Sequence, residues 1–235
     1  MDLNDLKQMY EGKKRRYGND AYLHLSEIFD EAREKYKQEY LNSPRASKLR
    51  AKGKVPDAEQ SWKAFKGKNF EKLVWYLLDD QLKTTGIRCV PGVWLERKSL
   101  NAELSEVYRK LLIRYGKWSI LPDADLVMYD PSTRKILGMI SCKITLRERV
   151  AQTAYWKLKL ASDPLTMHIK GYFITIDEDG DLIKSLSESP SRNRIIVEHE
   201  LDGTYVFRKV SESEKVKSFS KFIEDVRKAV KNKNP

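Results

Sequence analysis

Hydrophobic residues recur at helical spacing through most of the first eighty residues. Residues 4–16 and 20–41 each predict a helix, and Asn42-Ser43-Pro44 ends the second of these. Residues 58–82 predict a longer helix, whose apolar face consists of Phe70, Leu73, Val74, Leu77 and Leu78. The intervening segment 45–56, RASKLRAKGKVP, carries five basic residues and no acidic one. This composition predicts a mobile basic loop.

From residue 87 onward the pattern changes to short apolar runs, which are typical of buried strands. Such runs predict strands at residues 87–90, 126–129, 136–140, 172–176, 194–197 and 205–210. Helices are predicted at residues 100–115, 145–160 and 215–231. The turn-forming residues 130–134, DPSTR, join the second and third strands into a β-hairpin. This order predicts an α/β or α+β core with a central mixed sheet, preceded by a helical N-terminal extension.

Composition narrows the class of protein. The chain has 235 residues, of which 40% are hydrophobic, so it can bury a core and is not a disordered chain. We expect residues 1–56 to form the extension and residues 57–235 to form the core. No apolar run is long enough for a membrane helix, and the acidic, polar start does not match a secretory signal. Two cysteines, Cys89 and Cys142, are too few for a disulfide scaffold. These features predict a cytoplasmic protein without a membrane partner.

The charge balance points to a polyanionic partner. Lys and Arg number 45 against 34 Asp and Glu, which gives a formal net charge of +11. Nucleic acid is the first candidate for such a partner and a membrane surface the second.

Candidate chemistry is concentrated in residues 121–143, LPDADLVMYDPSTRKILGMISCK. Asp123 and Asp125 stand at the entrance to the first strand of the predicted hairpin, and Lys143 stands at the exit of the second. Because a hairpin brings the start of one strand beside the end of the next, these groups are expected to converge. If the first strand already begins at Asp123, the two carboxylates also share one face.

A carboxylate, a strand-end carbonyl and a lysine together suit Mg²⁺, which prefers oxygen ligands and keeps several waters. A metal-bound water is easier to deprotonate, and a lysine ammonium can stabilise charge that develops on a phosphate. The pattern therefore predicts phosphodiester hydrolysis. Each aspartate alone could equally be a solvated turn residue, so the prediction depends on the combination.

The same residues resemble a known family. Pro122-Asp123, Asp125 and the strand end Ser141-Cys142-Lys143 resemble the PD-(D/E)xK nuclease superfamily. The residues that follow, Ile144-Thr145-Leu146-Arg147-Glu148-Arg149 and then Gln152, Tyr155 and Trp156, resemble type II restriction endonucleases in particular. The resemblance covers roughly residues 65–176. It implies a restriction-endonuclease-like fold and Mg²⁺-dependent cleavage of double-stranded DNA at a short palindromic sequence by a homodimer. It also implies a cognate DNA methyltransferase.

One position departs from the family pattern. The acid that usually precedes the lysine by two residues is Ser141 here, so another acid must complete the site. Glu71 lies beside Val74, Trp75 and Leu78 on a predicted helix, where an unpaired acid is costly to bury. Glu148 fits a capping box that starts at Thr145, which favours a structural role. We therefore favour Glu71.

The resemblance implies a role for each site residue. Asp125, Asp123, Glu71 and the Cys142 carbonyl are expected to hold the metal, with Asp125 slightly favoured over Asp123 as the primary ligand. Lys143 is expected to position the attacking water. Residues of the following helix that could contact phosphates or bases are Arg147, Arg149, Lys157 and Lys159. Two alternatives stay open: a structure-selective repair or junction-resolving nuclease, and a DNA-binding protein whose nuclease core has decayed.

Overall fold

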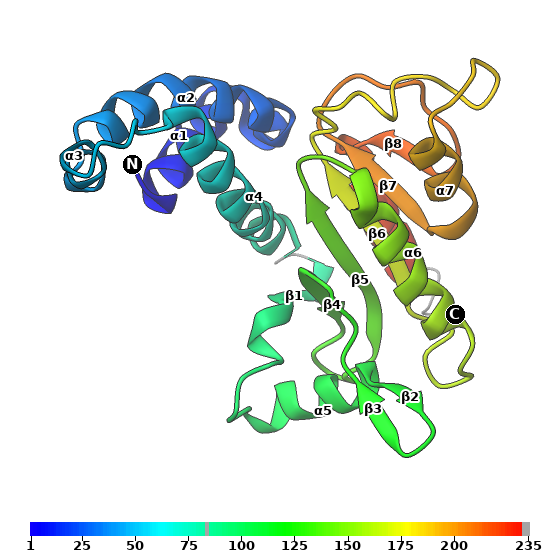
Figure 1. The fold of residues 1–235 in the computed structure, drawn as a ribbon. Coiled ribbons are helices and arrows are strands. Elements are labelled where there is room, and N and C mark those ends of the chain that lie inside the picture. The colour runs from blue at the N-terminus through cyan, green and yellow to red at the C-terminus, as the bar shows by residue number, and fades with distance from the viewer. Residues whose placement is uncertain (83–84, 232–235) are drawn as a thin grey trace. The chain divides into compact units, whose positions relative to one another are not determined.

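The computed structural model describes residues 1–82 and 85–231 and forms two compact units, residues 1–73 and 74–235 (Figure 1). The units divide inside one long helix, α4 (Ala58–Leu82), whereas the sequence placed the division at residues 56–57. None of the helices in the described ranges combines the length and apolarity of a membrane-spanning segment.

The N-terminal unit is entirely helical. Its elements are α1 (Leu3–Tyr17), the 3-10 helix η1 (Gly18–His24), α2 (Leu25–Leu41), α3 (Pro44–Ala51) and the first part of α4. Aromatic side chains from α2 and α4 form much of its core: Phe29 packs against Trp62 and Phe70, and Tyr36 packs against Phe65.

Two sequence predictions for this unit are corrected. The segment expected to be a mobile loop at 45–56 contains α3, which begins with Pro44 at its first position and is capped by the Ser43 hydroxyl on the Ala46 N–H. Proline and serine at these positions start a helix, although they were interpreted only as the end of the preceding one. The helix predicted at 20–41 begins at Leu25, after η1.

The C-terminal unit is built on a six-stranded mixed sheet of order β1-β4-β5-β6-β7-β8. Its strands are β1 (Arg88–Pro91), β4 (Leu126–Tyr129), β5 (Ile136–Lys143), β6 (Lys170–Thr175), β7 (Gly203–Val206) and β8 (Val216–Ser218). The pairs β1–β4 and β4–β5 are antiparallel, whereas β5 to β8 are parallel. The mixed sheet and the β4–β5 hairpin confirm the sequence prediction.

Helices flank this sheet (Figure 1). The helix α5 (Ala102–Leu111) packs with β1, β4 and β5 in one hydrophobic cluster. The helices α6 (Arg147–Ala161) and α7 (Arg192–Glu200) cover β6 and β7, where Val150 and Val197 pack with Phe173. On the opposite face, α8 (Ser220–Lys231) sets Phe222 against Tyr172 and Tyr205. Neighbouring strand residues point to opposite faces, so β6 packs against α6 and α7 through Phe173 and against α8 through Tyr172.

Several element boundaries in this unit differ from the prediction. The apolar run at 194–197, expected to be a strand, lies within α7, because a short run of this kind fits a half-buried helix equally well. The helix predicted at 100–115 ends at Leu111 and is followed by a small hairpin of β2 (Ile113–Tyr115) and β3 (Trp118–Ile120). The C-terminal helix predicted from residue 215 begins at Ser220, after β8.

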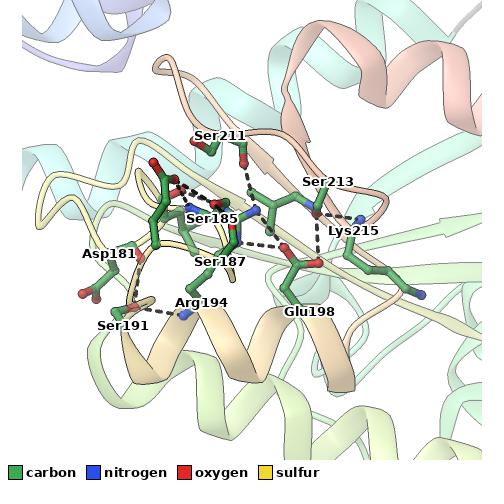
Figure 2. Close-up of polar contacts among 12 residues, drawn as sticks. Asp181, Ser185, Ser187, Ser191, Arg194, Glu198, Ser211, Ser213 and Lys215 are labelled. Carbon is green, nitrogen blue, oxygen red and sulfur yellow. Dashed lines mark hydrogen bonds and ion pairs between the residues drawn. The ribbon is translucent and has the colours of Figure 1, made fainter.

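A buried arginine ties the loop before α7 to the rest of the unit (Figure 2). The Arg194 side chain is fully buried and donates hydrogen bonds to the Leu182 carbonyl (2.7 Å) and the Ser211 carbonyl (2.8 Å). It also pairs with Glu198 at 2.8 Å, one helical turn further along α7. The Ser213 hydroxyl donates a further hydrogen bond to the Glu198 carboxylate at 2.9 Å. The cluster therefore joins two separate segments, at Leu182 and at residues 211–213, to α7.

Candidate active site

The β4–β5 hairpin brings Asp125 and Lys143 into contact, as the sequence predicted. Leu126 of β4 pairs with Ile140 of β5, which puts the residue before β4 beside the end of β5. Lys143 Nζ lies 2.7 Å from both carboxylate oxygens of Asp125. The Cys142 backbone N–H donates to Asp125 Oδ2 at 2.6 Å. Asp125 is thus held by one ammonium and one backbone donor.

A glycine fixes the backbone on the other side of Asp125. The Gly92 N–H donates to the Asp125 carbonyl at 2.8 Å. A Cβ at Gly92 would lie 1.8 Å from the Ala124 carbonyl oxygen, closer than any real contact allows. Gly92 is therefore required for the close approach of the two segments, and any larger residue there would displace Asp125.

Ser141 faces α6 rather than the solvent. Its side chain is buried, and its hydroxyl lies 2.9 Å from the Thr153 hydroxyl of α6. Ser141 and Lys143 alternate with Cys142 along β5, so they share the face that looks toward this helix. Ser141 thus links β5 to α6.

Asp123 lies at the rim of the same site. Because β4 begins only at Leu126, the condition for Asp123 and Asp125 to share a strand face is not met. Asp123 is exposed and accepts a hydrogen bond from Gln152 Nε2 at 2.6 Å. A small pocket is lined by Asp123, Asp125, Ser141, Lys143, Arg149, Gln152 and Thr153.

The two candidates for a further carboxylate have different surroundings. Glu148 is largely exposed and lies 3.6 Å from the Arg149 side chain. The capping box expected from Thr145 to Glu148 is wrong, because α6 begins at Arg147 and its cap residue, Leu146, has no side-chain hydrogen bond. Glu71 belongs to α4 in the N-terminal unit, and its role as a metal ligand stays a prediction.

Arginines mark the start of α6. Arg149 lines the pocket and is about half exposed, whereas Arg147 is 70% exposed and lies 3.6 Å from Asp179. Arg147 also has a φ of 39°, a left-handed conformation that is uncommon for residues other than glycine. Arginine in a first helical turn opposes the helix dipole, so an anionic ligand would be favourable there.

The two lysines expected to contact DNA lie in different environments. Lys157 is mostly buried, pairs with Asp202 at 2.9 Å and donates to the Ile169 carbonyl at 2.8 Å. Its ammonium therefore joins α6 to β6 and the loop before β7. Lys159 instead lies over the rings of Tyr115 and Tyr155, at 5.4 and 5.6 Å from their centroids. Of these two lysines, Lys159 is the one placed where a ligand could reach it.

We expect Lys157→Gln to lower the free energy of unfolding by about 1–3 kcal/mol, because it leaves part of the Asp202 carboxylate without its partner. Burial opposes ionisation of Asp202, but hydrogen bonds from Lys157 and Lys170 outweigh it and lower the carboxyl pKa. The stabilisation is therefore present above the ordinary aspartate pKa and disappears as the pH falls below it. Urea denaturation at pH 7 measures the decrease, with Lys159→Gln as the matched control. An equal decrease in both variants would contradict the structural role of Lys157.

Three residues of the site are not evident from the sequence alone. Gly92 follows Pro91 in what reads as an ordinary turn, and Thr153 reads as an interior helix residue. Gln152 enters only as part of the family pattern. Gln152 and Thr153 are three and four residues after Arg149, a candidate DNA-binding residue. Residues with this spacing lie on the same side of a helix, and that was the one signal in the sequence that could have placed them in the site.

The atoms of this site that could bind a metal ion are oxygens. Within residues 1–82 and 85–231, no three His, Cys, Asp or Glu side chains are arranged to hold a metal ion. The pocket offers two carboxylates, Asp123 and Asp125, together with the Ser141 hydroxyl. In a strand the N–H and C=O of one residue point toward the same neighbour, so the Cys142 carbonyl lies on the Asp125 side. This set suits a hard cation that keeps several waters.

Comparisons with known proteins identify the relatives of this chain. Residues 103–231 match the family model described as BsaWI restriction endonuclease type 2. The putative type II restriction enzyme MjaVIP of Methanocaldococcus jannaschii is 36% identical over 86% of this chain and 92% of its own length. The probable type II restriction enzyme HpyAORF263P of Helicobacter pylori is 37% identical over 53% of this chain and 65% of its own.

A solved structure shares the fold. The restriction endonuclease PspGI, in complex with substrate DNA, superposes with a TM-score of 0.58 and 17% identity, over 99% of this chain and 94% of that one. The restriction-endonuclease-like architecture predicted from the sequence is thereby confirmed. The family match and the relative from M. jannaschii show that this chain belongs to the type II restriction endonucleases of the PD-(D/E)xK superfamily, which are site-specific deoxyribonucleases.

Proposed function

We propose that this protein hydrolyses both strands of double-stranded DNA at a short palindromic sequence, as a homodimer and with Mg²⁺ as cofactor. The observation that carries the proposal is the contact between Asp125 and Lys143 at the end of the β4–β5 hairpin, in a pocket bordered by arginine. Both side chains line this pocket, at the start of β4 and the end of β5.

The chain's own residues have separate tasks in the proposed reaction. Lys143 is 28% exposed, so its ammonium can reach a phosphate at the mouth of the pocket, orient the attacking water and stabilise the negative charge of the transition state. The Asp125 carboxylate is held between Lys143 and the Cys142 N–H, which limits its movement before substrate binds. Gln152 orients Asp123 from α6.

Asp125, Asp123 and the Cys142 carbonyl would hold the Mg²⁺, and Glu71 is the proposed further ligand. When bound, the ion would promote deprotonation of a water and offset charge on the phosphate. Asp125 is the favoured primary ligand because its carboxylate already binds a cationic group, the Lys143 ammonium, through both oxygens.

Positive side chains near the pocket would hold the DNA. Arg149 lies at the pocket, Arg147 begins the same helix, and Lys159 is further along it. Contacts with phosphates position the duplex, whereas contacts with base edges select the sequence. A homodimer would match the two-fold symmetry of a palindrome, and a cognate DNA methyltransferase would protect the host's own sites.

Digestion of a sequenced plasmid tests this function. With Mg²⁺ we expect discrete fragments whose sequenced ends share one short palindromic motif, and no cutting in EDTA. A smear or cutting only at branched structures would favour a repair or junction-resolving nuclease. If unmodified protein bound the plasmid but never cut it with Mg²⁺ or Mn²⁺, the chain would be a DNA-binding protein with a decayed nuclease core.

The two aspartates are expected to differ in effect. Asp125→Ala should lower the cleavage rate by at least about 100-fold, because it removes the carboxylate that contacts both Lys143 and the strand end. Asp123→Ala should lower it by about 10-fold, because that exposed carboxylate contacts only Gln152 among the described side chains. Single-turnover cleavage at saturating Mg²⁺ measures both. A reversed order would make Asp123 the primary ligand.

A further inference from the structure

The helix α3 and the turn after it form a concentrated basic surface in the N-terminal unit. The segment 44–56 contains five cations and no acid: Arg45, Lys48, Arg50, Lys52 and Lys54. All five side chains are exposed. In the described part of the chain, none of them takes part in an ion pair or a side-chain hydrogen bond. Their charge is therefore available to a ligand.

The neighbouring helix α2 shows the opposite arrangement. Each of its three cations contacts a carboxylate: Arg33 lies 2.9 Å from Glu59, Lys37 contacts the same glutamate, and Lys35 lies 3.9 Å from Asp5. The N-terminal unit thus has enough acids to neutralise basic side chains on α2, yet none of its described acids pairs with α3. A solvated helix with mixed charges would resemble α2.

Three of the five cations lie on one side of α3 and the turn that follows it. Arg45, Lys48 and Lys52 are three and four residues apart, which places them on one side. Together with Leu49 they line a shallow hollow of about 300 Å³. The buried side chain of Ala46 and the Ser43 cap hold α3 in the unit, so this side is presented by an ordered element.

The helix dipole does not explain this arrangement. Lys48 and Arg50 in the last turn are favourable for the dipole, but Arg45 is in the first turn, where a positive charge is unfavourable. Arg45 adds positive charge to the side of α3 that carries Lys48, but it lowers the stability of the helix itself. Helix stability alone therefore does not account for the complete set.

We propose that Arg45 and Lys48 of α3, with Lys52 directly after it, form a second DNA-binding surface that contacts phosphates of the duplex without reading its sequence. The proposal rests on the proposed function, which supplies a DNA substrate. Phosphates spaced along a duplex fit a row of free cations on one side of a helix, and such contacts raise affinity for every sequence alike. The surface would therefore strengthen DNA binding without selecting the cleavage site.

The triple variant R45Q/K48Q/K52Q tests this surface in the full-length protein. Binding to a random-sequence duplex is measured by fluorescence anisotropy in EDTA over a range of KCl concentrations. Each cation that no longer binds a phosphate should make the plot of log affinity against log salt shallower by about 0.9, and the three together by roughly two to three. The cleavage sequence and the single-turnover rate at saturating protein should be unchanged.

The matched control is R192Q/K209Q/K228Q, which removes the same charge from three exposed cations of the C-terminal unit. Its salt slope should equal that of the unmodified protein, and both variants should unfold at the unmodified temperature. An unchanged slope for the α3 variant would overturn the proposal, as would an equal change in the control. Plasmid cutting is scored separately: if the protein never cuts but the α3 slope still falls, the nuclease proposal fails and the DNA-binding surface stands.

Discussion

Replacing Lys143 with alanine is expected to lower the DNA cleavage rate by at least about 100-fold while DNA affinity stays nearly constant. The ammonium lies 2.7 Å from both oxygens of Asp125, and its removal takes away the positive group that we propose to face the reacting phosphate. Overall affinity depends on many phosphate contacts, of which this is one. Single-turnover cleavage at saturating protein measures the first quantity, and anisotropy with Ca²⁺ in place of Mg²⁺ measures the second.

Lys135→Ala is the matched control, because Lys135 precedes the other end of β5 and is exposed. It should cleave at the rate of the unmodified protein. If Lys143→Ala cleaved within ten-fold of that rate, Lys143 would have no part in catalysis and the site would need another cation.

Replacing Arg194 with leucine is expected to lower the free energy of unfolding by about 3–5 kcal/mol, because it leaves a buried carboxylate without its partner. Glu198 is only 7% exposed, and the variant also deprives the Leu182 and Ser211 carbonyls of a donor. Urea denaturation followed by circular dichroism provides the measurement.

Arg192→Leu is the control for this experiment, since Arg192 is exposed on the same helix, and it should change stability by no more than about 0.5 kcal/mol. The double variant R194L/E198L should recover part of the stability, because it removes both buried charges together. A decrease below about 1 kcal/mol in R194L would show that the network of Figure 2 does not stabilise the fold.

The contact between Asp125 and Lys143 could be predicted because it depends on a local hairpin. The turn at residues 130–134 sets the pairing of two short apolar strands, and the pairing in turn places Asp125 beside Lys143. A short turn allows few ways of pairing the two strands. The order of residues along the hairpin was therefore enough to predict that Asp125 and Lys143 lie at the same end of the sheet.

Contacts between distant segments could not be predicted in this way. Gln152 reaches Asp123 across 29 residues, and Gly92 approaches the Asp125 backbone from the end of β1. Both contacts depend on how α6 and β1 pack on the hairpin, and local sequence patterns do not predict this packing.

The wrong element predictions had local causes. Ser191 caps α7 by accepting a hydrogen bond from the Arg194 N–H, but the apolar residues at 194–197 were given more weight than this capping signal. For α3, high charge was equated with mobility, although Ser43 and Pro44 form a good helix start. In both cases the capping residue was a better guide than composition.

Mn²⁺ anomalous diffraction from crystals of the protein with its cleaved or uncleaved DNA tests the proposed site most directly. We predict one Mn²⁺ ion coordinated by the Asp125 carboxylate and the Cys142 carbonyl, with Lys143 turned toward the scissile phosphate. An ion bound elsewhere, or DNA whose backbone passes the hairpin end without approaching Lys143, would contradict the assignment of this pocket as the catalytic centre.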